Sequence, residues 1–236
     1  MGQRADHICP YGVLQGTMAI VPFLVYNPIF NRVIIFPNNH NDKFPMKLRI
    51  ISGELKGRYI LVPDDAGFRP TLERTRESVA EILKKRLKSG VKAADFCAGS
   101  GAFGFEMLSR GAVSVDFVEK ERAAALRISE NAKRIGVEER VNVICSDINK
   151  FIDNRAAFYN VIFYDPPYDD EKLAQLVPEL LELLKDGGVL VYERKRRLGE
   201  KKIIAVDSEK NMFDARIFSD TVVEFYEKTL LTEEHS

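Results

Sequence analysis

The chain has 236 residues, enough to bury the core of one large domain or of one domain with appendages. Its formal net charge at pH 7 is zero, which excludes a polycation and limits any nucleic-acid surface to a local patch. The three cysteines include no CxxC pair, which indicates a reducing, cytoplasmic setting. The three histidines lie near the chain ends, so we predict neither a metal site nor a histidine-based triad.

Residues 1–45 differ in pattern from the rest of the chain. The apolar run Met18–Phe30 is interrupted by Pro22 and Pro28 and is shorter than the roughly 20 residues of a membrane-spanning helix. It also lacks the basic start and the cleavage site of a signal peptide, so no contact with a membrane is predicted. The polar run Asn38–Asp42 is typical of a boundary. We therefore expect residues 1–45 to be an atypical extension and the working protein to begin near Met46.

Residues 46–90 predict a β-hairpin followed by a helix. Two β-like runs, Leu48–Ile51 and Arg58–Val62, flank a glycine-containing loop, as in a hairpin. Pro70-Thr71 marks the start of a helix with Thr71 as its expected N-cap, and Ser89-Gly90 marks its end. The apolar stripe of this helix consists of Val79, Ile82, Leu83 and Leu87.

Residues 91–230 alternate between strand-like and helix-like segments. This rhythm predicts an α/β fold with a mostly parallel sheet, helices on both faces and a ligand at the carboxyl ends of the strands. Two runs separated by three residues predict an antiparallel C-terminal hairpin. The expected strands are Ala93–Cys97, Ser114–Glu119, Val141–Cys145, Val161–Asp165, Val189–Glu193, Phe213–Phe218 and Val222–Tyr226, and the expected helices lie at about 103–110, 121–136, 147–155 and 171–185.

A glycine motif follows the first parallel strand. Gly99, Gly101 and Gly104 form G-x-G-x-x-G at a strand-to-helix junction, where glycines let the backbone approach a ligand closely. Glu119 ends the next strand, twenty positions after Gly99, and is placed to bind two ribose hydroxyls. This combination predicts a nucleoside site, for which a dinucleotide and a sulfonium nucleoside are both open.

Two further acids bear on that choice. Asp95, at the entrance to the glycine turn, suits a ligand that carries an α-amino group and a positive sulfur. Asp147 follows the third parallel strand, where it could accept from an adenine amino group or act as the N-cap of the next helix. The pattern does not separate these two roles of Asp147.

The stretch Asp165-Pro166-Pro167-Tyr168 closes the fourth parallel strand. Two prolines stiffen the backbone and remove two N–H donors, which leaves their carbonyls free to accept from another group. An acid before this corner and an aromatic ring after it can bind a flat ligand with an amine: the oxygens accept from the NH₂ and the ring stacks. On its own the stretch could be a structural turn.

With these motifs in hand, residues Asp95 to Asp165 resemble a class I S-adenosylmethionine-dependent methyltransferase. Asp165–Tyr168 resembles the motif that methylates amino groups of nucleic acids. The resemblance narrows to the RsmD family over about Leu48 to Tyr226. It is carried by Arg49–Gly53, Lys56–Arg58, Arg69–Thr71 with Arg74, Arg76 and Glu77, Ala98–Gly101 and Leu108–Ala112.

The resemblance implies a Rossmann-like methyltransferase domain over residues 91–230 that acts on the exocyclic N2 of a guanine. The substrate it implies is 16S (small-subunit) rRNA or a small-subunit assembly intermediate, with S-adenosylmethionine as cofactor. Separately, we expect the protein to be a monomer, although the sequence leaves its oligomeric state open. It implies catalytic roles for Asp165, Pro166, Pro167 and Tyr168. The cofactor-binding residues that it implies are Asp95, Ala98, Gly99, Ser100, Gly101, Glu119 and Asp147.

The RNA surface is expected within residues 46–90, where basic residues exceed acids by five between Lys47 and Lys88. A solvated helix face accounts for the lysines near residue 85. Positive charge at a helix start opposes the helix dipole, so the arginines there are expected to meet phosphate or to order the substrate loop. The predicted RNA-binding residues are Lys56, Arg58, Arg69, Arg74 and Arg76.

Three other functions remain open on the sequence. The proline motif could serve a methyltransferase of DNA adenine N6 or cytosine N4, because it binds any exocyclic amine. The glycine motif could serve an NAD-dependent oxidoreductase, although this leaves Asp165–Tyr168 without a purpose. The chain could also be a binding-only RNA protein that has lost turnover.

Overall fold

A computed structural model describes residues 23–27, 32–36, 46–63, 70–84, 90–153, 158–168, 170–200 and 211–229 of the chain. The chain divides into two compact units, Met1–Lys43 and Phe44–Ser236. In the first, β1 (Phe23–Asn27) and β2 (Arg32–Phe36) form an antiparallel hairpin. The expected boundary Asn38–Asp42 lies outside the described residues, so the role of residues 1–45 stays a prediction. No described helix is long and apolar enough to cross a membrane.

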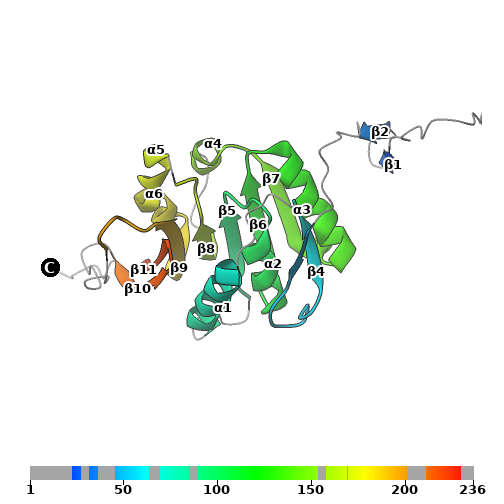
Figure 1. Cartoon of the computed structure of the whole chain (residues 1–236). Helices are drawn as coiled ribbons and strands as arrows, with labels where there is room; N and C mark the ends of the chain where they lie inside the picture. Colours follow the sequence, from blue (N-terminus) through cyan, green and yellow to red (C-terminus); the bar gives the residue numbers. More distant parts are fainter. Residues whose placement is uncertain are drawn as a thin grey trace, which may run out of the picture. The chain divides into compact units, whose positions relative to one another are not determined.

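A seven-stranded sheet forms the centre of the described part of the second unit (Figure 1). Its strands are β5 (Lys92–Phe96), β6 (Ser114–Glu119), β7 (Val141–Cys145), β8 (Tyr159–Tyr164), β9 (Leu184–Lys195), β10 (Met212–Phe218) and β11 (Thr221–Glu227). They lie in the order β10-β11-β9-β8-β5-β6-β7. Strands β5 to β9 are parallel, and β10 and β11 add antiparallel at one edge. The predicted Rossmann-like sheet with an antiparallel C-terminal hairpin is thereby confirmed.

Helices cover both faces of this sheet, over two separate hydrophobic clusters. The helices are α1 (Pro70–Lys84), α2 (Ala102–Ser109), α3 (Arg122–Ile135), α4 (Ile148–Ile152), α5 (Glu171–Ala174) and α6 (Val177–Glu182), with a short 3₁₀ turn at Glu138–Arg140. One cluster joins α1, α2 and α3 to the sheet and includes Leu83, Phe105 and Ile128. The other joins α4, α5 and α6 to the opposite face and includes Phe151 and Leu180.

Two helix predictions need correction. The single helix expected at 171–185 is two helices, because Pro178 lies in the first turn of α6, where a missing N–H costs nothing and a new helix begins. The helix after the hairpin starts at Pro70, so Thr71 lies inside it and is not its N-cap. Val79 and Leu83 of the expected stripe are fully buried, whereas Leu87 lies outside the described residues.

A second small sheet packs on the α2 side of the fold. It consists of β3 (Met46–Arg49) and β4 (Tyr59–Val62), the hairpin that the sequence predicts. The loop between the strands contacts α2 so closely that a Cβ on Gly53 would lie 1.8 Å from the Ser109 carbonyl oxygen. Gly53 also has φ of +88°, a conformation that favours glycine. Both constraints explain why glycine occupies this position.

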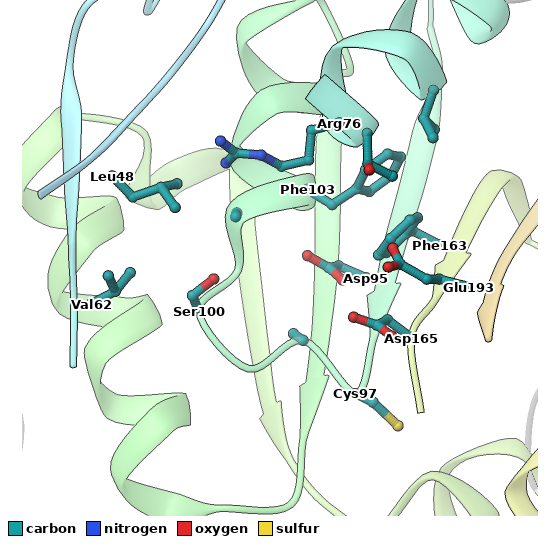
Figure 2. Close-up of a pocket in the computed structure, with 14 residues that line it drawn as sticks. Leu48, Val62, Arg76, Asp95, Cys97, Ser100, Phe103, Phe163, Asp165 and Glu193 are labelled. Carbon is teal, nitrogen blue, oxygen red and sulfur yellow. The ribbon is translucent and has the colours of Figure 1, made fainter. Parts of the chain in front are cut away.

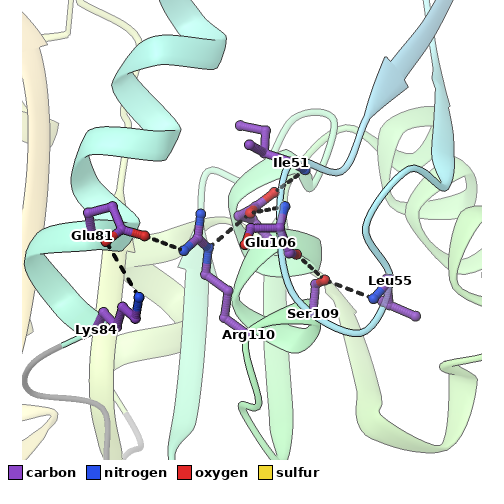
Figure 3. A network of polar contacts seen from close by, with 8 residues as sticks. Ile51, Leu55, Glu81, Lys84, Glu106, Ser109 and Arg110 are labelled. Carbon is purple, nitrogen blue, oxygen red and sulfur yellow. Dashed lines mark hydrogen bonds and ion pairs between the residues drawn. The ribbon is translucent and has the colours of Figure 1, made fainter.

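The side chain of Glu106, on α2, anchors this loop (Figure 3). It is 1% exposed, and its carboxylate accepts from the backbone N–H of Ile51 at 2.9 Å and of Ser52 at 3.1 Å. It also pairs with Arg110 Nε at 2.9 Å, and Arg110 reaches the exposed Glu81 at 3.1 Å. A buried carboxylate with these partners holds the hairpin loop on α2 without an uncompensated charge.

We expect Glu106→Ala to lower the free energy of unfolding by about 3–5 kcal/mol, because it leaves a buried arginine and two N–H groups without their acceptor. Glu81→Ala is the matched control, since it removes the exposed partner of the same arginine and should cost about 1 kcal/mol or less. Urea denaturation of both variants measures the two values. Equal losses would contradict the anchoring role of Glu106.

Candidate active site

The glycine turn after β5 is built from left-handed backbone. Cys97, Gly99 and Gly101 have φ of 58°, 51° and 73°. The Gly101 N–H donates to the Ala98 carbonyl at 2.7 Å, which closes the turn at the start of α2. Gly104 lies in the first turns of α2, where a Cβ would come within 2.3 Å of the Phe117 ring. The motif therefore combines a tight turn with close packing of a helix on a strand, the two purposes that its glycines predict.

Each of the five parallel strands carries an acid within two residues of its carboxyl end. In parallel sheets these ends lie at one edge, and here the chain order reverses between β5 and β8, where a ligand crevice is expected. The acids are Asp95 on β5, Glu119 on β6, Asp147 after β7, Asp165 after β8 and Glu193 on β9. This edge is therefore lined by acids and suits a cationic ligand.

The larger of two cavities at this edge has a volume of about 470 Å³. Its lining joins the glycine turn, the ends of β6 and β7 and the proline corner. Glu119 lies on its wall and accepts from the N–H of Gly99 at 2.7 Å and of Glu121 at 2.8 Å. The predicted residues that line this cavity are Gly99, Glu119, Asp147, Asp165, Pro166, Pro167 and Tyr168.

Asp147 has the capping role that its position suggested. Its Oδ1 accepts from the N–H of Asn149 at 2.9 Å, at the start of α4. The hydrogen bonds from Asn149 hold the pKa of this carboxyl below its usual range. Because the side chain also lines the larger cavity, the capping role does not exclude a contact with a bound adenine.

The smaller cavity, of about 120 Å³, is shown in Figure 2 with the residues that line it. Asp165 and Cys97 line both cavities. The stacked rings of Phe103 and Phe163, with centroids 4.0 Å apart, form part of its wall. The predicted cofactor residues Asp95, Ala98 and Ser100 line this cavity, together with Arg76 and Glu193.

Burial and the charges of neighbouring acids raise the pKa values of the carboxyls that line the smaller cavity. Burial raises the pKa of Asp95 to about 8, against a hydrogen bond from the Gly104 N–H at 2.9 Å, and Glu119 raises it further. Burial, with the charges of Glu193 and Asp95, raises the pKa of Asp165. Burial also raises the pKa of Glu193. These carboxyls hold protons more tightly than solvated ones, so a ligand cation would be favoured here.

Glu193 is a site residue that the sequence reasoning missed. It is 3% exposed, and its Oε1 accepts from the Tyr168 hydroxyl at 3.3 Å. Tyr168 is 42% exposed and lines the larger cavity. A signal was available, since Glu193 ends a strand that was predicted as parallel, at the same edge as the other four acids.

The structure separates the predicted RNA-binding residues. Lys56, Arg58 and Arg74 are exposed, and Arg58 donates to the Ile135 carbonyl. Arg69 lies outside the described residues. Arg76 does not have the surface position expected of a phosphate contact: it is 7% exposed and lines the smaller cavity. Arg76 lies three positions before the buried Val79, so the two residues share one face of α1. That face points inward, which explains why Arg76 is buried.

Comparison with solved structures first defines the class of protein to which this fold belongs. The S-adenosylmethionine-dependent methyltransferase from Agrobacterium tumefaciens shares the fold, with a TM-score of 0.57 at 16% identity over 87% of this chain and 77% of that one. The yhhF protein of Escherichia coli aligns with a TM-score of 0.68 at 26% identity, over 78% of this chain and 99% of that one. The fold is that of a Rossmann-like class I methyltransferase.

The family follows from the sequence comparisons. The family described as "Conserved hypothetical protein 95" matches residues 48–227. The Escherichia coli K12 protein named "Ribosomal RNA small subunit methyltransferase D" is 33% identical over 147 residues, 62% of this chain and 71% of that protein. A protein of the same name from Buchnera aphidicola (subsp. Acyrthosiphon pisum) is 31% identical over 73% of this chain and 84% of its own length. The chain belongs to this family, the RsmD family, as the resemblance predicted.

The raised pKa of Asp95 makes stability depend on pH. Between its ordinary value of 3.8 and about 8, the folded state keeps a proton that the unfolded state releases, so stability falls as pH rises through this window. Asp95→Asn cannot release this proton, and its amide oxygen can still accept from Gly104. We expect the free energy of unfolding of the variant to rise relative to that of the wild type by up to about 1.4 kcal/mol per pH unit between pH 4 and pH 8. Urea denaturation across this range measures the difference, and a constant difference would contradict a buried titrating Asp95.

Proposed function

We propose that the protein transfers a methyl group from S-adenosylmethionine to the exocyclic N2 of a guanine in small-subunit rRNA, as a cytoplasmic monomer acting on 16S rRNA or an assembly intermediate. The observation that carries the proposal is Asp165, which lies before a rigid proline corner and lines both cavities of the crevice. Membership of the RsmD family supports it, as do the relatives named for methylation of small-subunit rRNA.

The residues of the crevice fit a sulfonium nucleoside. Glu119 and Asp147, on the wall of the larger cavity, offer oxygens to ribose hydroxyls and to an adenine amine. Asp95, Asp165 and Glu193 give the smaller cavity an acidic lining that suits a positive sulfur and an α-amino group. When bound, S-adenosylmethionine supplies a methyl group already activated by its positive sulfur. The protein then has to place the acceptor nitrogen correctly, more than to supply a strong base.

Asp165 and the proline corner would hold the acceptor amine. The lone pair of a guanine amine is delocalised into the ring, which makes the nitrogen a poor nucleophile. Hydrogen bonds from its two N–H groups to the Asp165 carboxylate and the Pro166 carbonyl would turn that lone pair out of the ring plane. Two successive prolines stiffen this backbone, so the two acceptors keep a constant separation.

Tyr168 and Glu193 would complete the base site. The exposed Tyr168 ring offers a stacking surface for a base taken out of its helix. Its hydroxyl is held by Glu193 at 3.3 Å, which limits rotation of the ring. Glu193 is in this respect a positioning residue, and it also raises the pKa of Asp165.

The RNA backbone would meet the exposed cations of the hairpin and of α1. Lys56 and Arg58 lie on the β3–β4 hairpin, and Arg74 lies on the first half of α1. Such contacts are independent of sequence and position the RNA, while the crevice reads the base. Arg69 belongs to this proposal on its sequence position alone.

The direct test is methylation of 16S rRNA, isolated from a strain that lacks its endogenous family member, with labelled S-adenosylmethionine and mapping of the product. We expect one guanine N2 to be labelled. Asp165→Asn should lower kcat at least about 100-fold, because it removes the negative acceptor of the amine. Its affinity for S-adenosylhomocysteine should stay within several-fold of the wild type.

Asp153→Asn is the control, since Asp153 is an exposed acid at the end of α4. It should methylate at the wild-type rate. Label on an adenine or a cytosine would contradict the guanine assignment. Wild-type turnover by Asp165→Asn would contradict the role of Asp165.

A pH profile tests the coupling of Glu193 to Asp165. If the amine binds to the carboxylate form of Asp165, kcat/KM falls on the acid side as Asp165 takes up its proton. Glu193→Gln removes a charge that raises the pKa of Asp165, so this acid limb should move to lower pH. Glu224→Gln is the matched control, because Glu224 is a buried acid on the neighbouring strand β11 that lines neither cavity. An acid limb that stays in place, or moves to higher pH, in Glu193→Gln would refute the coupling.

A further inference from the structure

Arg76 is a buried cation whose hydrogen bonds are not made within the described part of the protein. It is 7% exposed, and neither its Nε nor its Nη2 has a hydrogen-bond partner there. An unsatisfied buried donor destabilises a fold, and an unsatisfied charged group does so more strongly. Such a group in a cavity indicates a bound ligand whose acceptor atoms satisfy these donors.

The surroundings of Arg76 indicate what this ligand carries. Its cavity of about 120 Å³ has three other charged lining residues, all of them acids: Asp95, Asp165 and Glu193. Figure 2 shows the guanidinium toward Leu48 and Ser100, and the three carboxylates toward the opposite side of the cavity. The lining thus presents one positive end and one negative end. A zwitterion with a carboxylate and an ammonium group matches this arrangement in charge.

The carboxylate of Glu106 is the nearest competing explanation, because its charge acts on Arg76. Glu106 already accepts from Ile51, Ser52 and Arg110. It accepts from neither Nε nor Nη2 of Arg76. Glu106 therefore offsets part of the charge of Arg76 but does not satisfy its donors.

The size and position of the cavity restrict the ligand further. Its volume is well below the roughly 300–1,000 Å³ of pockets that enclose whole small molecules, so it would hold one end of a longer ligand. The larger cavity, with Glu119 and Asp147, shares the residues Cys97 and Asp165 with it. A nucleoside in the larger cavity could therefore place an attached amino-acid group beside Arg76.

We propose that Arg76 binds the α-carboxylate of the methionine group of S-adenosylmethionine, while Asp95, on the opposite side of the cavity, binds its α-ammonium. The planar guanidinium can offer two parallel N–H donors to a carboxylate, a match that a lysine does not reproduce. This inference rests on the proposed cofactor. It assigns to cofactor recognition an arginine that the sequence places among RNA contacts.

Calorimetry with two stable ligands tests it without turnover. S-adenosylhomocysteine carries the amino-acid group, and 5′-methylthioadenosine lacks it. Arg76→Met should weaken S-adenosylhomocysteine roughly 10- to 100-fold, as expected for a lost charge-assisted hydrogen bond. Its affinity for 5′-methylthioadenosine should change less than about twofold. The affinity of Arg76→Lys for S-adenosylhomocysteine should lie between those of Arg76→Met and the wild type.

Arg127→Met is the control for loss of a positive charge, because Arg127 is an exposed arginine on α3. It should bind both ligands as the wild type does. Equal weakening of both ligands by Arg76→Met, or of neither, would overturn the proposal. If Arg76→Met does not fold, the wild type decides: it should bind the carboxamide analogue of S-adenosylhomocysteine at least about tenfold more weakly than the acid. Equal binding of the two would overturn the role of Arg76, whereas a wild type that binds none of these nucleosides would overturn the proposed cofactor itself.

Discussion

The parallel alignment of β5 to β9 is the constraint on which the rest of the site depends. It brings the carboxyl ends of five strands to one edge of the sheet, and every one of them ends near an acid. Residues nearly one hundred positions apart, Asp95 and Glu193, thereby line the same cavity. Burial, and with it the repulsion between neighbouring acids, raises the pKa values of Asp95 and Asp165. The same repulsion would be relieved by a cation, so the sheet geometry itself favours a positively charged ligand.

The β3–β4 hairpin and α1 lie opposite this acid-lined edge of the sheet. Leu48 and Val62 of the hairpin, with Arg76 of α1, close the smaller cavity from the side opposite the strand ends. The hairpin in turn depends on Glu106, whose buried carboxylate fixes the loop on α2. A segment that carries exposed cations therefore also contributes to the wall of the crevice.

Membership of the RsmD family and the geometry of the crevice support the same chemistry from independent directions. Family membership rests on the match over residues 48–227, whereas the crevice rests on where the side chains lie. Asp165 connects them, because it belongs to the proline motif and also lines both cavities. An oxidoreductase reading of the glycine turn explains neither the proline corner nor the family.

Local patterns in the sequence determined the elements of this protein. Alternating strand and helix signals gave the sheet and its antiparallel end, and the motifs around Gly99 and Asp165 indicated the crevice, because turn geometry depends on residues close in the chain. Only the tertiary structure decided which side chains face that crevice. Glu193 enters it from the last parallel strand, and Arg76 turns inward from α1 although its neighbours read as a basic surface. Burial depends on packing between segments far apart in sequence, which the spacing of residues within one segment does not contain.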